Sequence, residues 1–299
     1  MKLDGIAAFV AVAEAGSISE AARRLRLAKS VVSERLAELE RQLGGKIFHR
    51  TTRKLTLTED GAAFLEQATR ITRDVEEAAA GFAERRGTLS GPMRLSAPVT
   101  FGRMHLGKAL WSFLERHPAI SLDLELNDRR VDVASEGFDA VIRHGSIADS
   151  RLMVWRLAPS RRVFVASPDY LARRGTPRSL EDLEEHDGIF YSNRGAADWR
   201  LLEAGGGVRL VRARAKLALN NGDLMRDAAV AGRGLALLPS FITWEAMEAG
   251  QLAVVDVGFR PEEESIFIAH PEGRQPSAKL RALADHLKSA FGSPPYWDV

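Results

Sequence analysis

The 299 residues, of which 45% are hydrophobic and 27% charged, have the composition of a folded globular protein with two or three domains. The chain contains no cysteine, which excludes disulfides, thiol catalysis and cysteine-ligated metals. No apolar run approaches the roughly 20 residues that span a bilayer. The first residues, "MKLDG", lack the apolar core of a signal peptide, so we expect a cytoplasmic protein with no membrane partner.

The net charge of +2 conceals an uneven distribution along the chain. Residues 1–58 hold 11 lysines and arginines against 6 acidic residues, so this segment carries +5 and the remaining residues carry −3. A basic segment attached to a slightly acidic remainder is typical of a protein whose basic part meets a polyanion.

The chain begins with two short helical patterns. Residues 3–15 place apolar side chains at helical spacing, and Gly16 ends this pattern. Ser17, with Glu20 three residues later, predicts a capping box at the start of a second, short helix over residues 18–25.

A third helix and a hairpin follow. After a turn near residues 26–28, apolar residues at helical spacing predict a helix over 29–43, which two glycines stop. Two short alternating runs, 46–49 and 54–57, predict a β-hairpin with "RTTR" at its tip. Two helices and a turn are often only structural, but the basic residues gather on the third helix and the hairpin. The segment 1–58 is therefore predicted to be a winged helix-turn-helix DNA-binding domain.

We expect the third helix to enter the major groove and the hairpin to contact DNA beside it. Ser30 fits a simple N-cap as well as a DNA contact, and Arg35 fits either a phosphate contact or a partner for a nearby glutamate. Arg53 fits either a minor groove or a solvated cationic turn. The candidate DNA-binding residues are Lys29, Ser30, Ser33, Glu34, Arg35, Arg50, Thr52, Arg53 and Lys54.

Residues 59–86 predict a long amphipathic helix that Thr58 caps. Its apolar residues recur at alternating steps of three and four, which fits either a packed surface helix or a dimer seam. Because little neighbouring sequence is available to cover this seam, we favour a second copy of the chain. The seam residues are Leu65, Ala68, Thr72, Val75, Ala79 and Phe82.

Beyond a linker at 87–92, predicted strands and helices alternate, which indicates a mostly parallel α/β sheet. The expected strands are 93–97, 120–126, 140–143, 163–166, 235–238 and 266–269. The expected helices are 106–116, 131–136, 224–231 and 277–291.

The segment "SISEAARRLRLAKSVVSERLAELERQLGGKIFHRTTRKLTLTEDG" resembles the DNA-binding head of LysR-type transcriptional regulators. "GPMRLSAPVTFGRMHLGKALWSFLERHP", "EGFDAVIRHG", "VFVASPDYLARRG", "DLEEHDGIFY" and "DAAVAGRGLALLPSF" resemble the effector domain of the same family. The similarity extends over the whole chain, and the subgroup named for the meningococcal adhesion regulator is the nearest in pattern. The head departs from the common pattern at Ala28, Lys29 and Glu34, which leaves the DNA sequence that it reads open.

This resemblance implies a fold, a set of domains and a set of partners. The fold is α/β overall, with a winged helix-turn-helix at 1–58, a linker and dimerisation helix at 59–88, and an effector domain at 89–299 like a type II periplasmic binding protein. Its first subdomain would span about 91–163 plus 266–299, and its second about 164–265, with crossings near 163–166 and 265–269. The implied partners are double-stranded DNA with a dyad, a small-molecule effector for which an organic acid is one candidate, a second copy in a dimer or a dimer of dimers, and RNA polymerase.

Ligand sites in such folds lie where strands end and helices begin, which selects three segments. Arg143 fits a salt bridge to Asp139 or another acid nearly as well as a ligand contact, and His144 fits an ordinary hydrogen-bonded surface histidine. Asn221 is predicted to cap the helix that follows it. The candidate effector-binding residues are Pro98, Val99, Thr100, Phe101, Arg143, His144, Gly145, Asn220, Asn221 and Gly222.

No catalytic constellation stands out in the sequence. It holds no Gly-x-Ser-x-Gly elbow, phosphate loop or His-Glu-x-x-His motif, and its seven histidines lack metal-ligand spacing. We therefore expect a regulator rather than an enzyme, with no catalytic residues, cofactor or metal. The alternative is a solute-binding or enzymatic α/β protein with an incidental helix-turn-helix, which salt-dependent DNA binding would distinguish.

Overall fold

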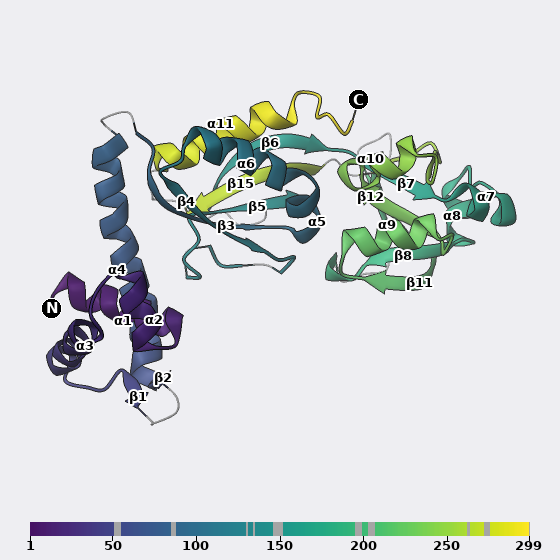
Figure 1. Ribbon diagram of the computed structural model, residues 1–299. Helices are drawn as coiled ribbons and strands as arrows, with labels where there is room; N and C mark the ends of the chain where they lie inside the picture. Colours follow the sequence, from purple (N-terminus) through teal and green to yellow (C-terminus); the bar gives the residue numbers. More distant parts are fainter. Residues whose placement is uncertain are drawn as a thin grey trace. The chain divides into compact units, whose positions relative to one another are not determined.

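A computed structural model describes residues 1–50, 55–84, 88–129, 131–133, 135–145, 152–194, 199–202, 207–261, 264–271 and 276–298. The chain divides into two units, Met1–Pro92 and Met93–Val299 (Figure 1). Among the helices within these ranges, none alone is long and apolar enough to cross a membrane, and helices 3–15 and 18–24 pass that test only as a pair bent by 118°.

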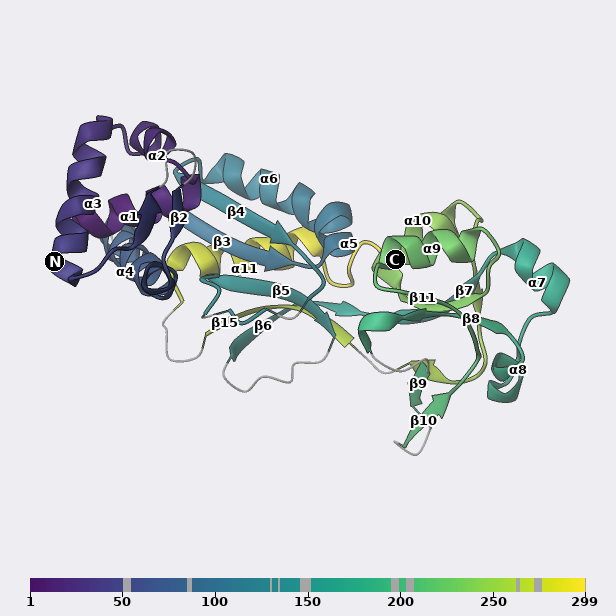
Figure 2. The ribbon, with the colours of Figure 1, turned by 90° about the horizontal axis from the view of Figure 1, so that it is seen from below.

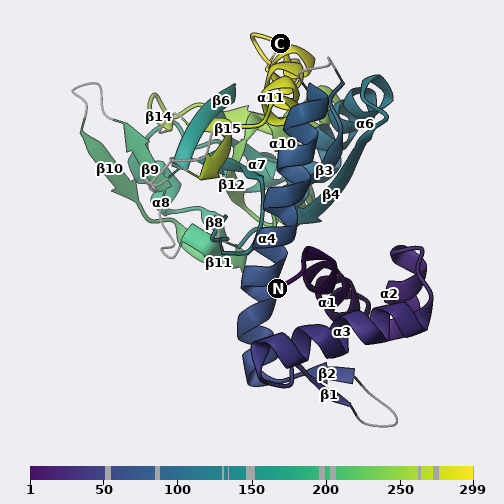
Figure 3. The ribbon, with the colours of Figure 1, turned by 90° about the vertical axis from the view of Figure 1, so that its left-hand side faces the viewer.

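In the first unit, three helices precede a two-stranded hairpin and a long helix (Figure 3). β1 and β2 pair antiparallel, with His49 opposite Thr56. This order confirms the predicted winged helix-turn-helix fold. The elements are α1 (Leu3–Ala15), α2 (Ile18–Arg24), α3 (Lys29–Leu43), β1 (Phe48–Arg50), β2 (Leu55–Leu57) and α4 (Glu59–Glu84).

Local chemistry and one aromatic cluster fix this unit. The Ser17 hydroxyl accepts a hydrogen bond from the Glu20 amide at 3.1 Å, which confirms the predicted cap of α2. Phe9 is fully buried, and its ring packs against the rings of Phe48 and Phe64, each 5.4 Å away between centroids. The hairpin and α4 thus share one core with the helices.

The start of α4 is locked against the hairpin. The Thr58 hydroxyl accepts a hydrogen bond from the Gly61 amide at 2.9 Å, which confirms that Thr58 caps α4. The same hydroxyl donates to the Lys46 carbonyl oxygen at 2.7 Å. A Cβ at position 61 would lie 2.1 Å from the carbonyl oxygen of Ile47, so only glycine allows this close approach.

The first turns of α4 are covered by the chain itself, contrary to the expectation that little neighbouring sequence was available. Ala68 is fully buried, and Leu65 packs against the core formed with α1, α2 and α3. The predicted seam therefore begins as an internal contact, because its apolar residues face the helices that precede it.

The second unit contains a five-stranded sheet in the order β4-β3-β5-β15-β6. Helices α6 (Gly107–Arg116) and α11 (Ala278–Phe291) lie on one face of this sheet (Figure 2). The chain from β3 to α6 passes through α5 (Val99–Phe101) and a π-helical turn, η1 (Gly102–Leu106). The strands are β3 (Gly91–Ala97), β4 (Ile120–Leu126), β5 (Ala140–Gly145), β6 (Leu152–Ser160) and β15 (Glu264–Pro271).

Two further sheets are formed by the strands that lie between β6 and β15 in the sequence. The larger has the order β11-β8-β12-β7-β13 and the smaller the order β10-β9-β14. Their strands are β7 (Arg162–Ala166), β8 (Asp187–Tyr191), β9 (Trp199–Leu202), β10 (Val208–Val211), β11 (Arg214–Leu219), β12 (Leu235–Pro239), β13 (Ala253–Val255) and β14 (Arg260–Pro261). The helices are α7 (Pro168–Arg174), α8 (Leu180–Glu184), η2 (Ser192–Arg194), α9 (Gly222–Val230) and α10 (Ser240–Glu248).

Both five-stranded sheets are mixed, so the prediction of a mostly parallel sheet was wrong in part. β3 runs parallel to β5, and β8 runs parallel to β11 and β12. However, β15 pairs antiparallel with β5 and β6, and β7 pairs antiparallel with β12 and β13. The two antiparallel strands β7 and β15 each begin just after the chain has passed from one sheet to another. The first passage is at Arg161 and the second follows Pro261. The expected helix over 131–136 is also wrong, because its described residues lie in turns or have no regular structure.

The segment after α11 packs against η1 and α10. Trp297 is buried, and its ring contacts those of His105 and Phe241, which come from η1 and α10. His105 Nε2 faces the Phe241 carbonyl oxygen at 2.9 Å, so this nitrogen donates and Nδ1 accepts. The Tyr296 hydroxyl therefore donates to His105 Nδ1, at 2.6 Å.

Candidate DNA-binding surface and effector site

The N-terminal turns of α3 present polar side chains to solvent. Lys29, Ser30 and Glu34 are exposed, and Ser33 is half-buried. Ala28 precedes them without a side-chain cap, as its methyl group requires. Val32 is fully buried on the opposite face, so the core fixes which face of α3 points outward.

Most cations near this face are paired inside the unit. Arg35 donates to Asp4 at 3.1 Å, so its partner is an aspartate of α1 rather than a glutamate. Arg23 and Arg24 both pair with Glu20. In contrast, the described residues offer Lys29 and Arg26 no ion pair. Arg26 has φ of 54° in the turn before α3, and the sequence analysis did not include it among the DNA contacts.

The hairpin is fixed at its base by a buried carboxylate. Glu40 accepts hydrogen bonds from Lys46 Nζ at 2.8 Å and from the Ile47 amide at 3.2 Å. Arg50 ends β1. The remaining predicted contacts of the tip, Thr52, Arg53 and Lys54, lie outside the described residues.

The outer turns of α4 differ from its inner turns. The Thr72 hydroxyl donates to the Ala68 carbonyl oxygen at 2.9 Å, so it is satisfied within the helix. The side chain of Val75 is 42% exposed, and Ala79 is also exposed. Phe82 belongs to the helix, but its side chain lies outside the described part of the chain. The part of the predicted seam that a partner can cover thus starts near Val75.

In the second unit, residues of the turn between β3 and α5 make contacts within the chain. Pro98 precedes α5 with an extended backbone. The Val99 amide donates to Asp128 Oδ1 at 3.1 Å, so it is already bonded within the chain. Phe101 is fully buried among the rings of Phe241, Phe291 and Trp297, so its side chain belongs to the core and not to a ligand site.

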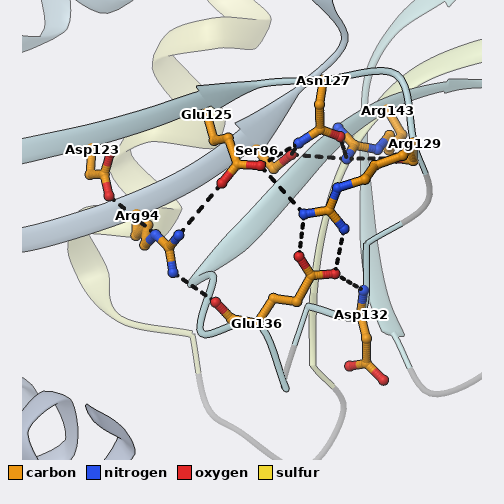
Figure 4. A network of polar contacts seen from close by, with 9 residues as sticks. All are labelled: Arg94, Ser96, Asp123, Glu125, Asn127, Arg129, Asp132, Glu136 and Arg143. Carbon is orange, nitrogen blue, oxygen red and sulfur yellow. Dashed lines mark hydrogen bonds and ion pairs between the residues drawn. The ribbon is translucent and has the colours of Figure 1, made fainter. Parts of the chain in front are cut away.

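Arg143 lies at one side of a polar network whose residues come from β3, β4 and β5 and from the segments that follow β4 (Figure 4). Its guanidinium donates to Ser96 Oγ at 2.9 Å, to Asn127 Oδ1 at 3.4 Å and to the carbonyl oxygens of Ile142 and Arg129 at 2.9 and 3.4 Å. All four acceptors are neutral. Burial lowers the pKa of the guanidinium, and the nearby Asp128 carboxylate opposes this effect.

The expected alternative for Arg143, a salt bridge to Asp139, is wrong. Asp139 accepts a hydrogen bond from the Arg94 amide at 2.8 Å instead. The carboxylates of the network pair with other arginines: Arg94 binds Asp123 at 3.1 Å and Glu125 at 3.5 Å, and Arg129 binds Glu136 (Figure 4). Arg143 is thus the cation of this network that keeps only neutral acceptors among the described residues.

His144 is an internal contact rather than a surface histidine. Its side chain is 15% exposed, and Nε2 lies 2.9 Å from Glu264 Oε2 at the start of β15. Arg162 Nη1 lies 4.0 Å from the other oxygen of this carboxylate. These three ionisable residues therefore gather where the chain crosses between the sheets. Gly145 follows with φ of 121°, a conformation that favours glycine.

Asn220 is exposed before α9, and Asn221 Oδ1 accepts a hydrogen bond from the Leu224 amide at 3.0 Å. The predicted cap of α9 is therefore confirmed. Gly222 is buried against Ile242. A Cβ at position 222 would lie 2.6 Å from Ile242 Cδ1, so a larger residue would require a shift here. The next residue, Asp223, accepts a hydrogen bond from the Thr100 hydroxyl at 3.1 Å, which joins α9 to α5.

Sequence reasoning missed several polar residues of this region, because their partners are distant in the chain. Ser96 is the penultimate residue of a predicted strand, Asn127 directly follows another, and Asp223 directly precedes the predicted helix over 224–231. The rule that ligand sites lie at such positions could have selected all three. Nothing in the sequence pointed to the pairing of Glu264 with His144.

Comparisons with known proteins give matches over both units of the chain. Residues 3–62 match the model of the bacterial regulatory helix-turn-helix protein, lysR family, and residues 86–292 match that of the LysR substrate binding domain. PgrR of Escherichia coli is 34% identical over 295 residues, covering 96% of this chain and 98% of that protein. CrgA of Neisseria meningitidis is 32% identical over 287 residues, covering 95% of each.

Solved structures give the same result. A structure of CrgA has a TM-score of 0.60 at 27% identity and covers 97% of this chain and 99% of that one. Full-length CbnR, solved in complex with its target DNA, has a TM-score of 0.60 at 20% identity, covers 97% of this chain and all of that one, and shows the shared fold alone. With matches to both domain models, the chain belongs to the LysR family of transcriptional regulators, which join a helix-turn-helix DNA-binding domain to an effector-binding domain.

Proposed function

We propose that this regulator responds to a small organic acid whose carboxylate binds Arg143, in a site shared with Thr100 and the residues around Asn221. The observation that carries the proposal is the bonding of Arg143. A half-buried guanidinium stays charged in proteins, and neutral acceptors satisfy it less well than a bidentate carboxylate does. A ligand carboxylate would place a counter-charge in direct contact with the guanidinium, whereas the nearby Asp128 accepts a hydrogen bond from the Val99 amide.

A thermal-shift screen of organic acids, amino acids and aromatic acids on the full-length chain tests this proposal. We expect the shift produced by an acid to be lost in Arg143→Gln and retained in Arg129→Gln. Arg129 is the matched control, because it belongs to the same network but already pairs with Glu136 and Glu125. A shift that survives in Arg143→Gln would place the effector elsewhere.

For DNA binding, we propose that the exposed start of α3 reads the major groove through Lys29, Ser30, Ser33 and Glu34, and that the hairpin with Arg50, Thr52, Arg53 and Lys54 contacts the phosphate backbone. The exposure of the first residues of α3 supports this, as does the match of residues 3–62 to the helix-turn-helix model of the family. Arg35 is excluded from the proposal because Asp4 holds it.

Salt-dependent binding to promoter DNA tests this contact set. If Lys29 contacts a phosphate, Lys29→Ala lowers the slope of log K against log salt by about 0.9, whatever the sequence of the DNA. Arg23→Ala is the control, because Glu20 already pairs with Arg23. Equal slopes for the wild type and Lys29→Ala would remove Lys29 from the interface.

We further propose that the chain works as a dimer or a dimer of dimers in the cytoplasm, joined through the outer turns of α4, and that RNA polymerase is a further partner. The exposed Val75 supports this assignment. Sedimentation equilibrium of Val75→Glu is expected to show a smaller species than the wild type. An unchanged mass would assign the interface to another surface.

A further inference from the structure

Asp223 forms a polar contact between α9 and α5 in the second unit. These two helices follow strands of different sheets. Thr100 lies in α5, directly after β3, and Asp223 is the second residue of α9, after β11. The Thr100 hydroxyl donates to Asp223 Oδ2 at 3.1 Å, although 123 residues separate the two in sequence. Asp223 Oδ1 accepts from Arg103 of η1, and from Arg226 of its own helix at 3.3 Å.

The contact is enclosed and closely packed. Thr100 is 5% exposed, and the Asp223 side chain is 18% exposed. A Cβ on the neighbouring Gly222 would lie 3.4 Å from the Thr100 hydroxyl, so the backbone of α9 approaches Thr100 directly. Arg226 also lies 3.9 Å from the sulfur of Met104 on η1. The start of α9 is thus fitted against α5 and η1, and Asp223 is the acceptor that joins them.

Charges around Asp223 are balanced within the chain. Arg103 and Arg226 supply two positive charges, and Asp227, which pairs with Arg226 at 2.8 Å, supplies a second negative charge beside Asp223. The hydrogen bond to Asp223 is the largest of the effects that raise the pKa of Arg103. The contact therefore needs no further ion to hold it.

The chemistry of Thr100 makes this contact exclusive. A threonine hydroxyl has a single proton to donate, and here Asp223 receives it. A carboxylate can only accept hydrogen bonds. An acid that accepts from the Thr100 hydroxyl must therefore replace Asp223 as its acceptor.

We propose that Asp223 is an internal latch that competes with the effector for Thr100, so that binding of the acid releases the contact between α9 and α5. This inference rests on the proposed effector site at Arg143 and Thr100. It assigns to Asp223 the coupling step: ligand binding at one sheet frees the helix that follows a strand of the other.

Hydrogen exchange of the full-length protein tests the latch without any ligand. Asp223→Asn keeps the shape of the side chain and removes its charge. We expect amides of η1 and of the first turns of α9 to exchange about tenfold faster, because a charge-assisted bond between these elements is weakened. Asp227→Asn is the matched control, because it removes the same charge from the same helix, at a residue whose side chain bonds Arg226 and, within the described part of the chain, neither Thr100 nor Arg103. Equal exchange in Asp223→Asn and Asp227→Asn would overturn the latch.

Ligand binding tests the competition. Benzoate and succinate are the probes, and the acid that binds the wild type is expected to bind Asp223→Asn about tenfold more tightly and Thr100→Val more weakly. Faster exchange combined with an unchanged affinity in Asp223→Asn would overturn the competition. If neither acid binds any variant, the choice of effector class is wrong and the competition fails with it, whereas the exchange comparison still decides whether Asp223 holds α9 to α5.

Discussion

Replacing Gly61 with alanine is expected to destabilise the first unit, although alanine is the better helix former. The new Cβ would lie 2.1 Å from the carbonyl oxygen of Ile47 and 2.9 Å from its carbonyl carbon. This obstacle is backbone, and the same carbonyl accepts a hydrogen bond from the Thr58 amide at 3.1 Å, so either the hairpin or α4 must shift. Overpacking of this kind costs about 3 kcal/mol against about 1 kcal/mol gained in helix propensity, which leaves a loss of about 2 kcal/mol.

Hydrogen exchange of the full-length chain, followed by mass spectrometry, reports this loss for each unit separately. A loss of about 2 kcal/mol in global stability accelerates the slowest amides of α1 and α3 about 30-fold. Gly45→Ala is the control, because it makes the same substitution in the same unit and meets nothing within 4 Å. The reasoning is refuted if Gly61→Ala exchanges no faster than Gly45→Ala.

Three further substitutions test other contacts. Glu40→Ala leaves Lys46 and the buried Ile47 amide without their acceptor, and should cost about 2 kcal/mol, measured as a lower urea midpoint by far-ultraviolet circular dichroism. Tyr296→Phe removes the donor to His105 Nδ1 and should cost about 1 kcal/mol in the second unit, and an unchanged urea midpoint in near-ultraviolet circular dichroism would contradict this. Burial lowers the pKa of His105, so the unfolded chain binds its proton more tightly and stability is lost as pH falls below about 6.5. The thermal midpoint of His105→Gln should therefore vary less between about pH 8 and pH 5 than that of the wild type.

The first unit could be predicted largely from sequence because its determinants are local. Ser17 caps α2 and Thr58 caps α4 through amides three residues away, and glycines end α1 and α3. What the sequence did not indicate is that Ala68 is covered by the same chain, because periodicity reveals an apolar face but not the surface that covers it.

In the second unit, the site depends on contacts between distant segments, which a pattern read along the chain does not reveal. The cap at Asn221 was predictable, since its partner lies three residues away. The carboxylate that Thr100 meets lies 123 residues away, and the pairing of His144 with Glu264 depends on the register between β5 and β15. Phe101 was misassigned for the same reason, because only the packing of α10 and α11 shows that its ring is in the core.

The tryptophans of this protein are confined to one of its units. Trp111, Trp155, Trp199, Trp244 and Trp297 all lie within Met93–Val299, and Met1–Pro92 contains none. Trp199 is stacked on Phe190 in a buried cluster, while the Trp297 and Trp244 rings both contact Tyr296, beside α10. Tryptophan fluorescence, excited selectively, therefore reports on the effector-binding unit alone, because the DNA-binding unit contains no tryptophan. A change in this emission on adding promoter DNA would then show that DNA binding to the first unit alters the surroundings of tryptophans in the second.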